Sequence, residues 1–234
     1  MRYCRGFRRY LERARVGLMA YERIAKPLIG APGWRERDPP GSAYIDCDTV
    51  CRIVEMLRDA VAGGVCIVGP GVNRGVPGWC PEVAGPSPAV ASTGGRLLYV
   101  TSDLDSRPLL EQLSALAARV FLVHVHSDNH ARLSMVRGLP AGGWIVYTGQ
   151  ECSPWLMPMG GFTDGDRAIV LAMSLGAPWV RVMGFTGAPV AWHKEYPLFK
   201  GWKLSVAGRI VYEVARGLRY RVVPVTGGWV LEAR

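Results

Sequence analysis

The stretch LLYVTSDLDS, residues 97–106, joins an apolar run to a pair of aspartates. The apolar run Leu97–Val100 is typical of a buried strand, so Asp103 and Asp105 lie where the strand gives way to a loop. Carboxylates at positions i and i+2 of an extended chain point to the same side. Two such oxygen ligands suit a hydrated Mg²⁺ ion, and open α/β sheets bind ligands beyond the carboxyl ends of their strands. A solvated acidic loop is the alternative interpretation.

The rest of the chain alternates between short apolar runs and amphipathic segments, which favours a parallel sheet. We expect an α/β fold, with a mostly parallel sheet flanked by helices, an N-terminal helical segment and a C-terminal β-hairpin. Residues 1–62 are predicted to be a helical cap and residues 63–234 the α/β catalytic domain. The expected helices are 7–25, 46–62, 108–118, 164–175 and 204–217. The expected strands are 65–68, 97–100, 120–125, 144–148, 179–183, 221–225 and 228–231.

The composition is that of an ordinary globular protein of 234 residues with a net charge of +9. It contains neither a transmembrane run nor an apolar signal-peptide core, so we expect a cytoplasmic protein without a membrane partner. Six arginines lie between Arg2 and Arg15. They fit a solvated helix face, and a nucleic-acid-binding surface is the alternative. Asparagine and glutamine are scarce, which fits a thermophile.

Six cysteines are present, without a CxxC pair or zinc-finger spacing, so buried thiols are the default expectation. Cys47 and Cys51 would stack at i, i+4 on a helix, which is not a usual disulfide geometry. If the protein comes from a hyperthermophile, intracellular disulfides become possible.

A second polar cluster, HVHSDNH at residues 124–130, also follows an aliphatic run. Asp128 is expected to be a metal or substrate ligand and Asn129 to hydrogen-bond substrate. His124 is interpreted as a hydrogen-bonded core histidine, with a zinc site as the less favoured alternative.

A third cluster, GGFTDGDRA at residues 160–168, begins an amphipathic helix, with Thr163 as its expected N-cap. Free backbone N–H groups at a helix N-terminus favour phosphate binding. Acidic residues in a first helical turn also simply complement the helix dipole. Asp164, Asp166 and Arg167 together exceed what capping requires, which indicates a functional site.

Two further features complete the set. Gly69 and Gly71 follow a strand, and their spacing hints at close approach of backbone to a ligand, although it is neither a dinucleotide fingerprint nor a P-loop. Lys200 and Lys203 lie in a predicted loop rich in aromatic residues and could hold phosphates. Acidic strand ends, a glycine-rich helix start and a lysine loop are what metal-assisted phosphoryl or pyrophosphoryl transfer requires.

These motifs together resemble the archaeal 6-hydroxymethyl-7,8-dihydropterin pyrophosphokinases. The resemblance covers roughly residues 45–215 and rests on SDLD at 102–105, HSDN at 126–129, GFTDGDRA at 161–168 and KGWKL at 200–204. The glycine loop departs from the family pattern, since residues 69–73 read GPGVN.

The resemblance implies a catalytic domain similar to that of thiamin pyrophosphokinase, whose Asp-x-Asp-Ser motif binds Mg²⁺. It implies ATP as the donor, AMP as a product and a pterin hydroxymethyl group as the acceptor, in the synthesis of folate-type or methanopterin-type cofactors. Asp103, Asp105 and Asp128 would then hold the metal, with Asp164 and Asp166 completing its shell or orienting the nucleophile. Arg167, Lys200 and Lys203 would neutralise charge, while Asn129 and Thr163 would bind substrate. A homo-oligomer is possible, and Trp192 or Phe162 is a candidate for stacking on the pterin.

Three alternatives stay open at this point. Another diphosphokinase, such as a thiamin-like enzyme, would use the same metal motif with a different acceptor. A glycosyltransferase-like enzyme would use a nucleotide sugar and release no AMP from ATP. A nucleic-acid binder would show steeply salt-dependent binding.

Overall fold

The computed structural model describes residues 4–29, 47–72, 75–86, 97–104, 117–126, 129, 132–133, 136, 143–150, 156–185 and 197–234. Its helices are α1 (Arg5–Ile24), α2 (Lys26–Ile29), α3 (Cys47–Ala60), the 3-10 turn η1 (Val61–Gly63), α6 (Asp164–Leu175) and α7 (Pro197–Gly217). Its strands are β1 (Val65–Val68), β2 (Val83–Pro86), β3 (Leu97–Ser102), β4 (Ala118–His124), β5 (Trp144–Gly149), β6 (Met157–Pro158), β7 (Trp179–Met183), β8 (Tyr220–Val225) and β9 (Gly228–Ala233).

The described residues form one sheet with the strand order β6-β5-β4-β3-β2-β1-β7-β9-β8. Strands β1 to β7 pair in parallel, whereas β9 pairs antiparallel with both β7 and β8. The expected fold class is therefore confirmed, including the C-terminal hairpin. The parallel strands all present their carboxyl ends at the same edge of the sheet, and this edge carries the polar clusters singled out in the sequence.

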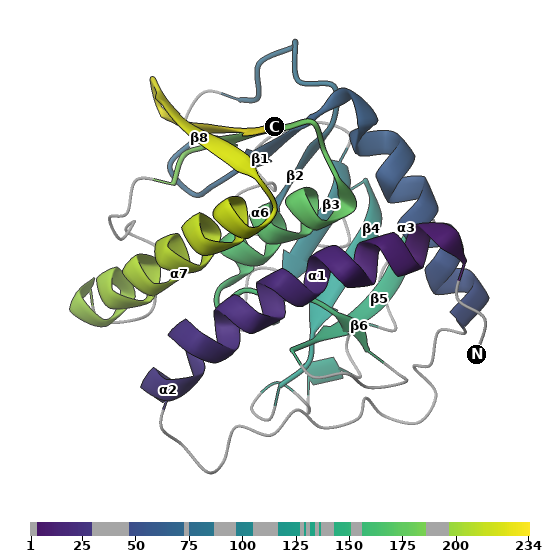
Figure 1. Cartoon of the computed structure of the whole chain (residues 1–234), viewed down its shortest axis with the longest axis horizontal. Coiled ribbons are helices and arrows are strands. Elements are labelled where there is room, and N and C mark those ends of the chain that lie inside the picture. Colours follow the sequence, from purple (N-terminus) through teal and green to yellow (C-terminus); the bar gives the residue numbers. More distant parts are fainter. Residues whose placement is uncertain are drawn as a thin grey trace.

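The strands are buried on both faces, which explains their continuous apolar runs. In β4, Val120 and Leu122 contribute to one apolar cluster, while Phe121 and Val123 contribute to a second cluster on the opposite face. The first cluster also includes side chains from α1, α3, α6 and α7. Figure 1 shows these helices on one side of the sheet, with α6 lying between the strands and α1 and α7.

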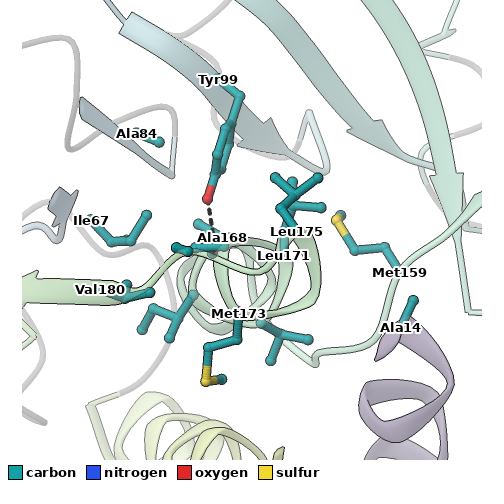
Figure 2. Close-up of a cluster of buried hydrophobic side chains, with 14 of the residues drawn as sticks. Ala14, Ile67, Ala84, Tyr99, Met159, Ala168, Leu171, Met173, Leu175 and Val180 are labelled. Carbon is teal, nitrogen blue, oxygen red and sulfur yellow. Dashed lines mark hydrogen bonds between the residues drawn. The ribbon is translucent and has the colours of Figure 1, made fainter. Parts of the chain in front are cut away.

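Helix α6 is the centre of this core, because every residue from Gly165 to Leu175 is buried. It contacts β1, β2, β3 and β7 on one side and α1 and α7 on the other. Figure 2 shows the strand side, where the Tyr99 hydroxyl donates a hydrogen bond of 2.7 Å to the carbonyl oxygen of Ala168. A helix that is buried all round needs such a position, between two layers.

Helix α1 fixes the position of α6. The guanidinium of Arg13 donates to the Met173 carbonyl oxygen from Nε at 3.1 Å and from Nη2 at 2.9 Å. Gly17 lies so close to Gly160 that a Cβ on Gly160 would come within 2.3 Å of the Gly17 carbonyl carbon. The boundary predicted at residue 62 stays a prediction, but α1 and α3 share the core of the sheet.

Most predicted elements are confirmed, with α6 and β7 at their predicted bounds. Three predictions need correction. Strand β2 lies inside residues 76–96, for which no element was assigned. Residue 118 begins β4 and does not end a helix; the rest of the helix predicted over 108–118 lies outside the described residues, except residue 117. Helix α7 begins at Pro197, so Lys200 and Lys203 lie on a helix and not in a loop.

The default expectation of buried thiols is wrong for one pair of cysteines. Cys66 in β1 and Cys80 form a disulfide with a sequence separation of 14 residues. Cys4 and Cys51 are free thiols. The disulfide closes the segment that leaves the carboxyl end of β1, which contains Gly69 and Gly71.

We predict that Cys80→Ser lowers the free energy of unfolding by about 2–4 kcal/mol, because a loop of this length is no longer closed in the unfolded chain. Chemical denaturation under oxidising conditions measures the loss. Cys4→Ser, which removes a free and partly exposed thiol, is the matched control and should cost less than about 1 kcal/mol. Equal stability of wild type and Cys80→Ser would contradict the prediction.

Candidate active site

The carboxyl end of β3 and the N-terminus of α6 meet directly. Thr101, at the end of β3, donates a hydrogen bond from Oγ1 to the backbone carbonyl oxygen of Asp164 at 2.8 Å. The backbone N–H of Asp103 donates to Oδ2 of Asp164 at 3.3 Å. Two of the predicted site residues, 61 positions apart in the sequence, are thus joined by a hydrogen bond.

Asn129 ties this point to the end of β4. Its side-chain nitrogen donates to the carbonyl oxygens of Asp103 at 2.8 Å and His124 at 2.6 Å. Its side-chain oxygen accepts the backbone N–H of His126 at 3.0 Å. Asn129 is fully buried, so its amide holds the two strand ends together. Its predicted hydrogen bond to substrate stays a prediction.

The chain turns sharply directly after Asp103. Leu104 has a φ of +62°, a left-handed conformation that bulky residues rarely adopt. Its backbone N–H donates a hydrogen bond to Ser102 Oγ at 3.1 Å, and its carbonyl oxygen accepts a hydrogen bond from Arg132 Nη1 at 3.1 Å. Strained backbone of this kind persists where the surroundings fix it, which is common at functional sites. The turn fixes the backbone on which the Asp103 carboxylate is carried.

The two described histidines of the second cluster differ in role. His124 is buried, and its Nδ1 lies 3.2 Å from Thr148 Oγ1. Burial, with smaller contributions from the charges of Arg167 and His126, lowers the pKa of His124 well below its usual value. The interpretation of His124 as a core histidine is confirmed. His126, in contrast, places Nε2 4.0 Å from Asp103 Oδ2. The sequence did not single out His126 as a neighbour of Asp103, although its position just beyond β4 indicates the same edge of the sheet.

Thr163 and Asp166 form the N-terminal cap of α6. Thr163 is the N-cap residue, as predicted, and pairs with Asp166 in a capping box. The Asp166 carboxylate accepts N–H donors from Phe162 at 2.7 Å and from Thr163 at 2.6 Å. It also accepts the Thr163 hydroxyl at 2.7 Å. Asp166 is only 3% exposed, so its oxygens face backbone and hydroxyl donors of the protein.

Asp164 and Arg167 form a pair beside this cap. Arg167 Nη1 donates to Asp164 Oδ1 at 3.1 Å, and Arg167 Nη2 donates to the Phe162 carbonyl oxygen at 3.2 Å. The Arg167 side chain is 5% exposed and that of Asp164 is 16% exposed. The Asp103 side chain is 22% exposed. Asp103 and Asp164 are therefore the carboxylates of this group that a ligand can reach.

Two glycines allow the backbone to pass close to Arg167 and to Phe185. Gly161 has a φ of +118°, and a Cβ there would lie 2.9 Å from the Arg167 backbone nitrogen. A Cβ on Gly69 would lie 2.6 Å from a Phe185 ring carbon. Phe185 also packs against Gly165, so one ring joins the loop after β1 to the start of α6. The close approach of a ligand to Gly69 and Gly71 stays a prediction.

The first turns of α7 adjoin the same helix start. The Trp202 ring meets Phe162 edge to face, with centroids 5.9 Å apart. Lys203 places Nζ 5.2 Å from the centroid of Phe199. Lys200 is partly buried on the same turn of helix. The predicted lysine motif thus lies on a helix whose Trp202 contacts Phe162, next to the capped start of α6.

Two of the three predicted metal ligands, Asp105 and Asp128, lie outside the described residues. Within the described part of the chain, no group of three or more His, Cys, Asp or Glu side chains is arranged to hold a metal ion. The oxygen donors of Asp103 and Asp164 are of the type that Mg²⁺ takes in pairs while keeping several waters. The donor chemistry therefore fits a hydrated magnesium ion.

No helix in the described ranges combines the length and apolar character that a membrane span requires.

We predict that Asp166→Asn lowers the free energy of unfolding by about 1–3 kcal/mol, because an amide cannot accept all three donors at this cap. Burial raises the pKa of Asp166 above 3.8, outweighing the lowering effect of its hydrogen bonds and of Arg167. Because the pKa is raised in the folded state, the unfolded chain releases the Asp166 proton at a lower pH than the folded chain does. The stabilisation by protonated Asp166 is therefore largest at low pH and decreases as pH rises through the raised folded-state pKa. Denaturation at several pH values measures the difference.

The control for this variant is Asp48→Asn, which alters an exposed aspartate in the first turn of α3. It should cost less than about 1 kcal/mol, the value of a surface charge at a helix terminus. A loss for Asp166→Asn that grows with pH would contradict the assigned direction of the pKa.

A comparison with curated proteins supports the motif resemblance. A curated protein of Pyrococcus furiosus, named 6-hydroxymethyl-7,8-dihydropterin pyrophosphokinase, is 37% identical over 100 residues. The match covers 42% of this chain and 42% of the length of that relative. No protein-family model matches the chain. The similarity to archaeal hydroxymethyldihydropterin pyrophosphokinases that the motifs predict is therefore confirmed, over less than half of either chain.

Proposed function

We propose that this chain is a 6-hydroxymethyl-7,8-dihydropterin pyrophosphokinase. It transfers the pyrophosphoryl group of ATP to the hydroxymethyl oxygen of the pterin and releases AMP, within the synthesis of a pterin cofactor. The observation that carries the proposal is the junction of Asp103 with Asp164 at the carboxyl end of β3, in a chain similar to a relative of that name. A cytoplasmic location, a homo-oligomeric state and a thermophilic source remain predictions.

Asp103 would hold Mg²⁺ together with Asp105 and Asp128, with Asp164 beside them. A magnesium ion bound there would supply charge neutralisation for the ATP phosphates. Asp103 is fixed through its backbone, because its N–H donates a hydrogen bond to Asp164 and its carbonyl oxygen accepts one from the side chain of Asn129. A site that is organised before the substrate arrives needs no rearrangement during the reaction.

The remaining polar residues divide into two groups. Asp166 and Asn129 act as positioning residues, because both are buried and saturated with hydrogen bonds from the protein. Arg167, Lys200 and Lys203 supply positive charge near the start of α6. Hydrogen bonds to Asp164 and to the Phe162 carbonyl oxygen hold the Arg167 guanidinium in place, so it would act on a phosphate from this fixed position. The lysines stand further out, on α7.

The reaction balances without a further reactant. The hydroxymethyl oxygen forms a bond to the β-phosphorus of ATP, the bond from that phosphorus to the α–β bridging oxygen breaks, and AMP leaves with that oxygen. The hydroxyl proton is lost to the surrounding solvent or a base. Positioning and charge neutralisation are the main requirements of such a transfer. In this proposal Asp103 and Asp164 would serve positioning, while a bound Mg²⁺ ion and the cationic side chains would neutralise the charge.

We predict that Asp103→Asn lowers kcat at least about 100-fold, because one of the carboxylates that would hold the charge-neutralising Mg²⁺ ion is lost. AMP release is measured with ATP, Mg²⁺ and 6-hydroxymethyl-7,8-dihydropterin, with and without EDTA. Asp59→Asn, at an exposed position of α3, is the matched control and should keep wild-type turnover. Turnover of Asp103→Asn close to wild type would reject the assigned role.

The same assay tests the acceptor. Pterin-dependent AMP release that EDTA abolishes would support the proposed function. ATP binding without pterin-dependent AMP would reject the pterin, and thiamin and nucleotide sugars would then be tried as alternative substrates. Steep salt dependence of RNA or DNA binding, without any AMP release, would favour the nucleic-acid binder.

A further inference from the structure

Two aromatic side chains at the start of α7 are exposed although they pack against each other. Phe199 is 51% exposed and Trp202 is 37% exposed. Their rings stack with centroids 5.6 Å apart and an interplanar angle of 20°. Large apolar side chains gathered on a surface commonly mark a binding site.

Trp202 continues the face by which α7 packs on the core. Val206, Ile210 and Val214 follow it at intervals of four residues and are all buried. The two helices run in the same direction, because Trp202 meets Phe162 at the start of α6 and Tyr220 donates to Ala177 beyond its end. Since Phe162 precedes the first residue of α6, Trp202 lies where α6 no longer covers this face, and its ring stays exposed.

Phe162 links the two exposed rings to the candidate active site. Its ring meets Trp202 at an interplanar angle of 87°. Its N–H donates to Asp166, and its carbonyl oxygen accepts Arg167, which also holds Asp164. The aromatic group of Phe162, Phe199 and Trp202 is thus attached to the capped start of α6, within a short chain of contacts from Asp103.

Positive charge accompanies the rings. Lys203 stands over Phe199 at 5.2 Å, and Lys200 lies on the same turn of α7. A flat apolar ring beside cations suits a ligand that combines a planar heteroaromatic ring with phosphate groups. Both substrates of the proposed reaction carry such a ring, the pterin and the adenine of ATP.

We propose that Trp202, backed by Phe199 and Phe162, stacks on the planar heteroaromatic ring of one substrate at this site. The proposal rests on the proposed function, since that function supplies the ligands with such rings. Stacking of a base on an aromatic side chain changes affinity by about tenfold or more when the side chain is truncated. Trp202 would therefore determine the affinity for one substrate and leave that for the other unchanged.

The test compares Trp202→Leu with Trp144→Leu. Trp144 is 48% exposed and begins β5, at the opposite end of the parallel strands from Asp103. Isothermal titration measures the affinity of each protein for 6-hydroxymethyl-7,8-dihydropterin and, separately, for α,β-methylene-ATP with Mg²⁺. We expect Trp202→Leu to weaken one of the two by about tenfold or more and to leave the other within about twofold, whereas Trp144→Leu changes neither. Trp202→Phe, which keeps a ring, should restore most of the affinity.

The outcomes separate this inference from the proposed function. Weaker binding of the pterin alone identifies Trp202 as the acceptor platform, and weaker binding of the ATP analogue alone identifies it as the adenine platform. If the wild type binds both ligands and Trp202→Leu binds both equally well, the inference is wrong and the proposed function stands. If the wild type binds neither ligand, both proposals fail. Should Trp202→Leu not fold, as judged by circular dichroism, Phe199→Leu is measured against the same predictions.

Discussion

The burial of α6 on every side is the constraint from which the site follows. A helix with no solvent-facing stripe must satisfy its first N–H groups inside the protein. The capping box of Thr163 and Asp166 does this. The carboxylate of Asp166 is thereby committed to the cap, while Asp164, two residues earlier, turns toward Asp103 and Arg167. Burial of one helix therefore separates a structural aspartate from an accessible one.

The same constraint explains why distant segments contribute to the site. Helix α1 holds α6 through Arg13 and through the close contact of Gly17 with Gly160. The loop after β1 and α6 share the ring of Phe185. A displacement of α6 would move Asp164 and would disturb its hydrogen bond with Asp103. The N-terminal helix thus supports the site from a distance, and Arg13, one of its six arginines, takes part in this support.

The sequence predicted what depends on local pattern. Continuous apolar runs identified β1, β3, β4, β5 and β7, because strands buried on both faces have few polar residues. The helix start at Thr163 followed from its capping residues. The features that it did not predict depend on long-range contacts, or on residue types that occur in more than one kind of local structure. Strand β2 reads Val-Ala-Gly-Pro, and glycine and proline argue against a strand until β1 and β3 are known to pair with it.

The start of α7 shows a different kind of miss. Pro197 occupies the first turn, where proline favours helix formation, but lysines and aromatic residues around a glycine at position 201 favour a loop when only the sequence is known. The disulfide between Cys66 and Cys80 could not be read from spacing, because several pairings of six cysteines are compatible with the sequence. For the site, the position directly after a strand was sufficient to place Asp103 at this edge of the sheet and was also a signal for His126, whereas the hydrogen bond between Asp103 and Asp164 required the fold.

The carboxylates of the site and the exposed aromatic rings beside it bear on different parts of the proposed function. In the proposed function, carboxylates that hold a metal beside ATP phosphates would serve pyrophosphoryl transfer to any hydroxyl, so Asp103 and Asp164 would account for the reaction type without specifying the acceptor. The acceptor is distinguished by contacts to its ring, because polar and stacking contacts made by only one substrate create a difference in affinity. In this chain the exposed rings lie at the start of α7, on Phe199 and Trp202. If Trp202 stacks on the acceptor, which is one outcome of the proposed test, the choice between a pterin and another acceptor depends on these rings more than on Asp103 and Asp164.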